Sequence, residues 1–277
     1  MFSHQPVTTS FVESNSIADV RKYDKDNDSW FVFDLDNTVH ETSLELGSDQ
    51  WFRALCQYGA TIKLEDGNAV ASVIAIYHAV QKHVNTVAVE QEAVDLIQSL
   101  QAEGRVVIGL TSRDTVLEEA TYRQLESIGI NLREKIIFCS GADKGVCFVN
   151  SLKGRDEQPQ HVIMAEDLLK HLVRMKAALQ PLGIDFTGIR YGYLDEKVKH
   201  LDMGKAHIQL FQLKPHLPER TQHMIECLGI NVPDNAAQTD YMSHFYFDAP
   251  LPKVNKNKPS PLLDEQGDYN QHNRVTK

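Results

Sequence analysis

One run of residues places the strongest constraint on what this chain can fold into. Trp30 to Phe33 is aromatic and β-branched, and it is followed by two carboxylates, Asp34 and Asp36, and then by Thr38. Such an apolar run predicts a buried strand. In an open α/β sheet, ligands bind just beyond the carboxyl ends of the strands. Two carboxylates so close together repel each other unless a cation or a shared proton offsets the charge. The run therefore indicates a divalent metal site, acid–base chemistry, or both.

Two less specific interpretations of the same run remain open at this point. One is a strand that ends in a solvated turn, and the other is a fragment of a calcium-binding loop. The calcium loop fits poorly, because no Gly or Glu follows at the offsets that an EF-hand requires. Further motifs in the rest of the chain decide between the metal site and the solvated turn.

Strand-like and helix-like segments alternate through most of the chain. Further strands are expected at residues 105–110, 136–139, 161–165 and 185–194. Helices are expected at residues 69–84, 89–101, 114–128, 144–152, 168–179, 202–213 and 218–228. This alternation predicts an α/β fold with a Rossmann-like, doubly wound parallel sheet.

The pattern is consistent with one large domain, residues 1–252, whose core spans about residues 15–40 and 90–230. A small helical insert is expected at about residues 41–88, because apolar residues there recur at helical spacing and the connection is longer than usual. Residues 253–277 are polar and lack the apolar residues that a core requires. They predict a disordered tail.

The composition is that of a soluble globular protein, with 277 residues of which 42% are hydrophobic and 24% charged. A net charge of −10 argues against nucleic acid as the main partner. No apolar run is long enough to cross a membrane, and the N-terminus lacks the basic and apolar segments of a signal peptide. The four cysteines have no metal-binding spacing and indicate free thiols in a reducing cytoplasm.

Three further motifs lie at the ends of other predicted elements. They are Thr111-Ser112 after an apolar strand, Lys144 at the start of a helix, and Glu166-Asp167 after another strand. Taken singly, each has an ordinary explanation, namely a helix N-cap, a solvated lysine and an acidic helix start. Their order and their placement at the ends of elements favour one common site.

Together with the first run, these motifs resemble the haloacid dehalogenase-like (HAD) superfamily of aspartyl-phosphate enzymes. Its members carry Asp-x-Asp-x-Thr/Val after a strand, then a strand ending in Thr or Ser, a Lys, and an acidic pair. The resemblance covers about residues 30–194. Trp51-Phe52 and the run 110–113 are similar to a branch of HAD proteins from intracellular bacteria that includes effector tyrosine phosphatases. The resemblance implies a HAD-type phosphatase, a phosphoric monoester hydrolase that uses Mg²⁺.

The resemblance also implies a role for each motif residue. Asp34 matches the nucleophile and a metal ligand, and Asp36 matches the general acid/base whose backbone carbonyl binds the metal. Thr111 and Ser112 match phosphate-binding hydroxyls, and Lys144 matches the lysine that steadies the nucleophile and the phosphoryl group. Hydrolysis through a covalent intermediate needs such a nucleophile, such an acid and base, and cations around the phosphoryl oxygens.

The acidic pair matches the metal-binding residues, with one departure from the family pattern. The first acid is Glu166, where the family usually has Asp, and the second is Asp167. Glu reaches one methylene further, so it would hold the metal directly with altered geometry or through water. Because magnesium demands near-ideal octahedral geometry, a weaker or less selective site is one outcome. Thr38 matches the hydroxyl of the first motif, which has a structural role.

Other polar residues have no assigned role in this resemblance. His40, His171, His200 and His207 share no ligand spacing and indicate surface or core histidines. Arg113 either reaches a substrate or forms a salt bridge at a helix start.

The predicted function is magnesium-dependent hydrolysis of a phosphoester. The short insert and the branch resemblance favour a phosphorylated protein side chain, in particular phosphotyrosine, as the substrate. Trp51, Phe52 and Tyr58 would supply the aromatic wall that phosphotyrosine suits, although core packing explains them equally well. The alternatives are a phosphatase of sugar or nucleotide phosphates and a catalytically weak binding protein on the HAD scaffold. The expected location is the cytoplasm or, by the branch resemblance, a host cell reached without a conventional signal peptide. The sequence leaves the oligomeric state open.

Overall fold

The computed structural model describes residues 9–24, 28–65, 67–132, 135–155, 157–231 and 239–247. The chain divides into two compact units, residues 1–246 and 247–277, and every element with defined bounds lies in the first. The predicted disordered tail, residues 253–277, lies outside the described residues.

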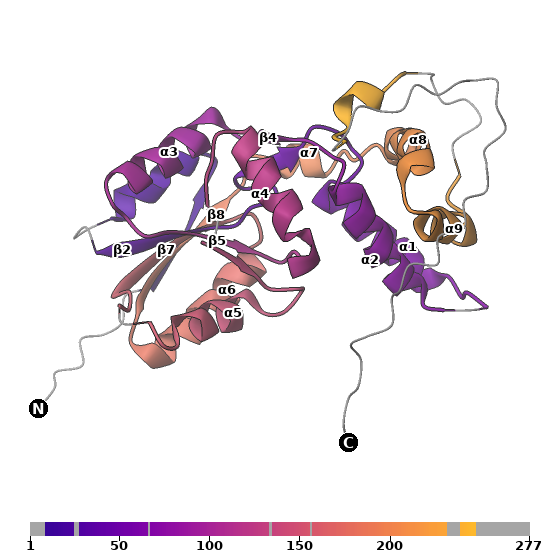
Figure 1. Cartoon of the computed structure of the whole chain (residues 1–277). Coiled ribbons are helices and arrows are strands. Elements are labelled where there is room, and N and C mark those ends of the chain that lie inside the picture. The colour runs from indigo at the N-terminus through magenta and orange to yellow at the C-terminus, as the bar shows by residue number, and fades with distance from the viewer. Residues whose placement is uncertain are drawn as a thin grey trace, which may run out of the picture. The chain divides into compact units, whose positions relative to one another are not determined.

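Six strands form one sheet in the order β1-β8-β7-β2-β5-β6, and every neighbouring pair is parallel (Figure 1). Their bounds are β1 Thr9–Ser14, β2 Ser29–Phe33, β5 Val107–Thr111, β6 Ile136–Phe138, β7 His161–Glu166 and β8 Asp185–Tyr191. The predicted α/β class with a parallel sheet is confirmed, and the arrangement is compatible with a Rossmann-like fold. Strand β2, which precedes the two carboxylates, lies inside the sheet between β7 and β5.

Helices cover both faces of the sheet. Because successive side chains of a strand point to opposite faces, each inner strand contributes residues to two separate cores. Phe31 and Phe33 of β2 lie in the core beneath α3 and α4, whereas Trp30 and Val32 lie in the core beneath α5 and α6. The bounds of these helices are α3 Gln91–Ala102, α4 Glu118–Ser127, α5 Lys144–Leu152 and α6 Leu169–Leu179. Figure 1 shows the two pairs of helices on opposite sides of the sheet.

A helical segment is inserted between β2 and β5, at the position where the sequence predicts an insert. Strands β3 and β4 pair in antiparallel fashion, and helices α1 and α2 lie between them in the chain. The bounds are β3 His40–Thr42, α1 Asp49–Thr61, α2 Ala69–Gln81 and β4 Thr86–Ala88. Each helix begins at a side-chain cap. Ser48 Oγ accepts the backbone N–H of Trp51, and Asn68 Oδ1 accepts those of Val70 and Ala71.

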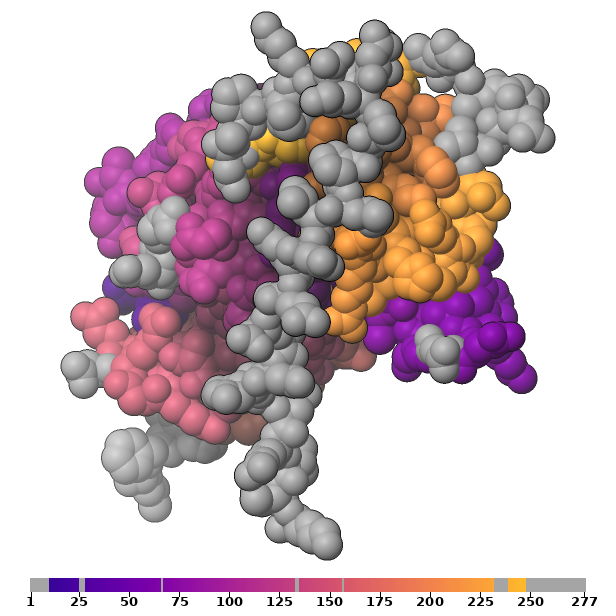
Figure 2. All heavy atoms as spheres, turned by 45° about the vertical axis from the view of Figure 1, so that its right-hand side comes forward, coloured from indigo at the N-terminus to yellow at the C-terminus, as the bar shows by residue number. Residues whose placement is uncertain are grey.

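Two helices that follow the sheet in the chain also join this insert. They are α8 Met203–Leu213 and α9 Glu219–Cys227. Helix α9 packs against α2, and the hydroxyl of Tyr58 donates to the carbonyl of Leu228 at 2.9 Å. The backbone N–H of Leu46 donates to Gln209 Oε1 of α8, also at 2.9 Å. Figure 2 shows the orange segment of α8 and α9 beside the purple insert. The helical part is therefore larger than residues 41–88.

The shorter elements of the described chain are α7 and several 3₁₀ helices. They are α7 Asp195–Val198 and 3₁₀ helices at Ile17–Tyr23, Thr115–Leu117, Gln180–Leu182, Lys214–His216 and Met242–His244. Strand β1 at the edge of the sheet was not predicted, and the strand predicted at 185–194 ends at Tyr191. Among the described helices, none has both the length and the apolar character that a membrane crossing requires.

Candidate active site

The strand order places three of the predicted site residues next to one another. Asp34 directly follows β2, Glu166 ends β7 and Thr111 ends β5. Because β2 lies between β7 and β5 and all three run parallel, these ends meet at one edge of the sheet. The backbone N–H of Asp34 donates to the carbonyl of Ala165 at 3.0 Å, which extends the pairing one residue beyond β2. The sheet thus gathers residues that lie far apart in the sequence.

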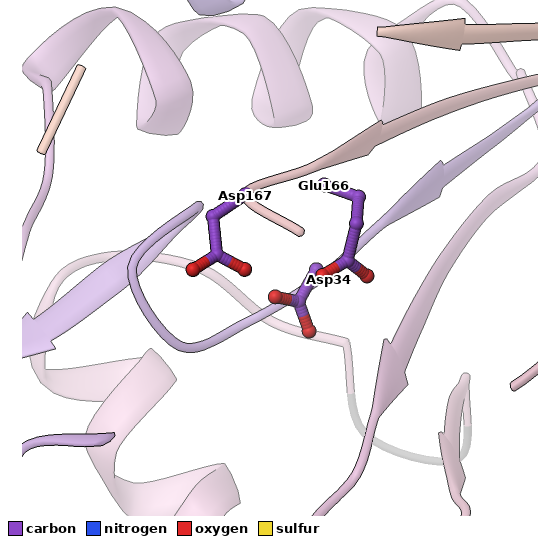
Figure 3. A group of neighbouring side chains, drawn as sticks. All are labelled: Asp34, Glu166 and Asp167. Atoms are coloured by element: carbon purple, nitrogen blue, oxygen red, sulfur yellow. The ribbon is translucent and has the colours of Figure 1, made fainter. Parts of the chain in front are cut away.

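Asp34, Glu166 and Asp167 direct their carboxylates toward one another (Figure 3). One oxygen from each lies within 4.8 Å of the others. Asp34 is 5% exposed and Glu166 is fully buried, whereas Asp167 is partly exposed. Burial and then the charge of Asp34 raise the pKa of Glu166 to about 7, and the same two causes raise the pKa of Asp167 well above its usual range. Fully ionised, this cluster therefore requires a compensating cation.

Lys144 supplies part of that positive charge. Its Nζ donates to Oδ1 of Asp34 and to Oε2 of Glu166, the latter at 2.7 Å. Burial opposes the charged form of the side chain, but the two carboxylates outweigh burial and raise the pKa of Lys144. The lysine is the first residue of α5, and Asp143 fixes the start of that helix by accepting the N–H of Gly145 at 2.8 Å. Lys144 is therefore charged and held between Asp34 and Glu166.

Both oxygens of Glu166 already have partners. Oε2 accepts from Lys144, and Oε1 accepts from Nδ1 of His171 at 2.9 Å and from the backbone N–H of Leu168 at 3.3 Å. The sequence assigned His171 to the surface or to a satisfied core. The structure instead places it beside the acidic cluster, on the first turn of α6. Burial lowers the pKa of His171 to about 4, with the charge of Lys144 adding to the shift.

The cluster fits a hard divalent cation. Carboxylate oxygens are the ligands that magnesium takes in proteins, usually one or two of them together with water and substrate phosphate. Each of the three carboxylates offers one oxygen to such an ion, although the oxygens of Glu166 and of Asp34 also accept hydrogen bonds. The residues present are thus chemically suited to magnesium, and Asp167 is the one that is partly exposed, whereas Glu166 is fully buried.

Asp36 faces Arg113 and not the acidic cluster. Nε and Nη2 of Arg113 donate to the two oxygens of Asp36 at 2.9 and 2.7 Å. Arg113 is 4% exposed, and the Asp36 side chain is 22% exposed. Burial would raise the pKa of Asp36, but the charges around it, that of Arg113 first, outweigh burial and lower the pKa. From the sequence, Arg113 was expected to contact a substrate or to form a salt bridge at a helix start. In the structure it pairs with Asp36, the candidate acid/base.

The three hydroxyl residues predicted for the site differ in burial and in hydrogen-bond partners. Thr111 is 1% exposed, and its Oγ1 accepts the backbone N–H of Arg113 at 3.1 Å, which leaves the hydroxyl proton available to another acceptor. Ser112 is exposed to solvent. Thr38 is fully buried, with Oγ1 at 3.5 Å from Oδ2 of Asp34. Thr111 and Ser112 thus lie next to each other at the end of β5, as the sequence predicts.

Two residues near the site were not assigned a site role from the sequence. Burial raises the pKa of Asp49, the first residue of α1, with the charges of Asp36 and Asp34 adding to the shift. His40 is fully buried, and neither of its ring nitrogens has a partner among the described groups. Burial, and then the charge of Arg113, lower the pKa of His40 to about 4. Asp49 reaches the site through the insert, so spacing along the chain gave no signal for it, whereas His40 lies only four residues after Asp36.

The aromatic residues of the insert pack mainly against one another. Trp51 is fully buried and stacks on Tyr77 with ring centroids 6.5 Å apart. Phe52 also lies against Tyr77, at 4.3 Å, but it is partly exposed. Trp51 is therefore a core residue, whereas Phe52 keeps part of its ring accessible.

A known protein family matches the region of the chain that holds this site. The family profile described as "Protein of unknown function (DUF2608)" matches residues 13–137 and 132–223, which include the acidic cluster, Lys144 and Arg113. No solved structure matches the chain. The matched region is therefore broad, but the family description assigns no reaction to it.

Three curated relatives are each named "Putative outer membrane protein". One from Chlamydia trachomatis is 19% identical over 182 residues, which cover 60% of this chain and 70% of the relative. One from Chlamydia muridarum is 20% identical over 185 residues, 61% of this chain and 70% of the relative. One from Chlamydia pneumoniae is 22% identical over 209 residues, 66% of this chain and 79% of the relative.

Proposed function

The chain belongs to the DUF2608 family, and we propose that it is a magnesium-dependent phosphoester hydrolase with a HAD-type core and an aspartyl-phosphate intermediate. The observation that carries this proposal is the position of Lys144 between two carboxylates. Its ammonium contacts Asp34 and Glu166 at the carboxyl end of the parallel sheet, and Asp167 lies beside them. A nucleophilic carboxylate, a fixed cation and metal ligands are the groups that phosphoryl transfer requires.

In the first step, Asp34 would attack the phosphorus atom, and the bond between phosphorus and the leaving oxygen would break. Lys144 holds the nucleophile in place and offsets the charge on the phosphoryl oxygens. Oγ1 of Thr111 accepts a hydrogen bond from the backbone, so its own proton is not used there. The hydroxyl can therefore donate to one of the phosphoryl oxygens. Asp36 would protonate the leaving oxygen; Arg113 favours the ionised form of Asp36, which opposes this first role and suits the base role in the second step.

In the second step, water would attack the phosphorus of the aspartyl phosphate and regenerate Asp34. Asp36 would take the proton of that water as a general base. Asp34, the backbone carbonyl of Asp36 and Asp167 would hold magnesium, with Glu166 next to them. When bound, magnesium supplies charge neutralisation and orientation of the phosphoryl group.

The substrate class is a narrower proposal. Phosphotyrosine on a protein is the substrate that the sequence predicts, and the partly exposed ring of Phe52 offers an aromatic surface for it. One observation favours the alternative of a small phosphorylated metabolite. Helices α8 and α9 enlarge the helical part beyond the predicted insert, and a larger cover suits a small, enclosed substrate.

The experiment is hydrolysis of p-nitrophenyl phosphate by the full chain, with magnesium and with EDTA. We expect turnover that EDTA removes and magnesium restores. Asp34→Asn should abolish it while the circular dichroism spectrum stays unchanged, and Asp95→Asn, on the exposed face of α3, is the matched control. Wild-type turnover in the Asp34→Asn protein would contradict the mechanism, and no turnover by the wild-type protein on any phosphoester would contradict the function.

A further inference from the structure

We propose that Arg113 is a positioning residue that fixes the carboxylate of Asp36 and connects it to the helical insert. The inference rests on the proposed phosphatase function. The guanidinium contacts both oxygens of Asp36, at 2.9 and 2.7 Å. A planar fork that binds both oxygens of a carboxylate allows one orientation of that carboxylate, which a single-point contact does not.

Arg113 is itself held in place by helix α4. Its Nη1 donates to Oγ1 of Thr121 at 3.0 Å and to Oε1 of Gln124 at 2.6 Å. Thr121 is fully buried and Gln124 is 1% exposed. Arg113 therefore cannot turn away from Asp36 without leaving buried polar groups unpaired, which is costly.

The same chain of hydrogen bonds continues into the helical insert. Nε2 of Gln124 donates to the carbonyl of Gln81 at 3.1 Å, and Gln81 is the last residue of α2. Nε2 of Gln81 in turn donates to the carbonyl of Gly47 at 2.6 Å, just before α1 begins. Gln81 is also fully buried. The orientation of Asp36 is thus linked, through the buried side chains of Arg113, Gln124 and Gln81, to the end of α2 and to the residues just before α1.

Arg113 would act on the reaction through Asp36 alone. Asp36 must point at the leaving oxygen in the first step and at the attacking water in the second. A misdirected carboxylate loses proton transfer but leaves the nucleophile, Lys144 and the metal ligands in place. The loss of rate in the first step should therefore be larger for a leaving group that needs protonation. General damage to the fold would instead slow both kinds of substrate equally.

The test compares two leaving groups in the full-length enzyme with magnesium. Phenyl phosphate releases a weakly acidic phenol that needs protonation, whereas p-nitrophenyl phosphate releases a far more acidic one. Arg113→Lys keeps the charge but loses the fork. We expect it to lower kcat/KM, which reports the first step alone, by about 10²-fold for phenyl phosphate and by about tenfold or less for p-nitrophenyl phosphate.

Arg105→Lys is the matched control. Arg105 forms the same two-point pair with Asp24, at 2.6 and 2.8 Å, and is similarly shielded, but it lies at the amino ends of the strands. Its replacement should change neither kcat nor the ratio between the two substrates. If Arg113→Lys folds poorly, Thr121→Val removes one anchor of Arg113 at nearly constant shape and should shift the ratio in the same direction.

A double variant tests whether Arg113 acts through Asp36. The Asp36→Asn protein and the Asp36→Asn, Arg113→Lys protein should have the same residual rate, because the first change removes the group that Arg113 positions. A slower double variant, or an equal loss of kcat/KM on both substrates, would overturn this inference and leave the phosphatase proposal intact. A wild-type protein without magnesium-dependent turnover would overturn the proposed function and this inference together.

Discussion

Lys144 and Glu166 form an ion pair inside the protein, with 2.7 Å between Nζ and Oε2 and with neither side chain more than 2% exposed. The other oxygen of Glu166 accepts from His171, so the glutamate joins α5 to α6. This arrangement gives a physical reason for the Glu at a position where the resemblance predicts Asp. The side chain contacts the lysine and the histidine, and in the proposed function it would leave metal binding mainly to Asp34 and Asp167.

Glu166→Gln should show how much ionisation of the buried Glu166 lowers the stability of the protein. Burial raises the pKa of Glu166 in the folded protein to about 7, above its usual value of 4.5. The folded state then holds the proton more tightly than the unfolded state, so the contribution of Glu166 to stability is complete below pH 4.5 and is lost as pH rises through about 7. In EDTA, the free energy of unfolding of the wild type minus that of the variant should fall across this range by on the order of 3 kcal/mol, as urea denaturation at several pH values would show. A difference that is constant with pH would contradict the raised pKa.

Asp167→Asn should weaken magnesium binding more than Glu166→Gln does. Asp167 is partly exposed beside Asp34, whereas the oxygens of Glu166 are occupied by Lys144 and His171. We expect Asp167→Asn to raise the magnesium concentration for half-maximal turnover by about 10²-fold, and Glu166→Gln by about tenfold, as for groups that act through a ligand. Magnesium titrations of turnover give both values. The reverse order would show that Glu166 is the direct ligand.

Much of the site could be predicted because it lies at strand ends. Asp34, Thr111 and Glu166 each end or follow an apolar run, and parallel strands bring such ends to one edge. Local sequence was enough to find five of the six strands of the sheet, and their alternation with helices was enough to predict that they run parallel. The order of the strands within the sheet was not among these predictions.

The parts that the sequence did not reveal depend on side-chain orientation and on distant packing. Arg113 pairs with Asp36, and His171 pairs with Glu166, through rotamers that residue spacing does not determine. Strand β1, Thr9–Ser14, is mostly polar because it lies at the sheet edge, so it lacks the apolar run that marks the inner strands. Asp49 reaches the site only through the fold of the insert.

Phe52→Leu should reduce turnover of phosphotyrosine selectively if the substrate is a protein. The Phe52 ring lies 4.3 Å from that of Tyr77 and is partly exposed, so it can stack on a phenyl ring. Loss of such stacking is worth about 1 kcal/mol, or roughly fivefold in kcat/KM. A phosphotyrosine peptide should lose this factor, while a sugar phosphate should not. Phe11→Leu, on the edge strand β1, is the control and should change neither.

The substrate class is tested directly by comparing several substrates of the wild-type protein. The wild-type protein should prefer the phosphotyrosine peptide over a phosphoserine peptide and over sugar phosphates by about tenfold or more in kcat/KM, which is about 1.4 kcal/mol. A preference of that size for any small metabolite would refute a protein substrate and leave the phosphatase proposal intact.

Gly145→Ala tests the close approach of α5 and α6 that holds Lys144 in place. A Cβ atom at Gly145 would lie 2.6 Å from the carbonyl oxygen of Arg174 and 2.9 Å from Cβ of Ala178, so the helices would have to separate. Overpacking of this kind costs about 1–3 kcal/mol, which exceeds the gain of about 1 kcal/mol that Ala brings to a helix interior. Urea denaturation should therefore show a destabilised protein, and turnover should fall because Lys144 moves with α5.

The adjacent residue provides the control for that variant. Val146 lies in the same turn of α5 but is 53% exposed, so Val146→Ala should change stability by about 0.5 kcal/mol or less. A Gly145→Ala protein as stable as this control would show that the two helices can separate without cost. If it were destabilised but fully active, the position of Lys144 would not depend on the contact between α5 and α6, and its ion pairs with Asp34 and Glu166 alone would hold it.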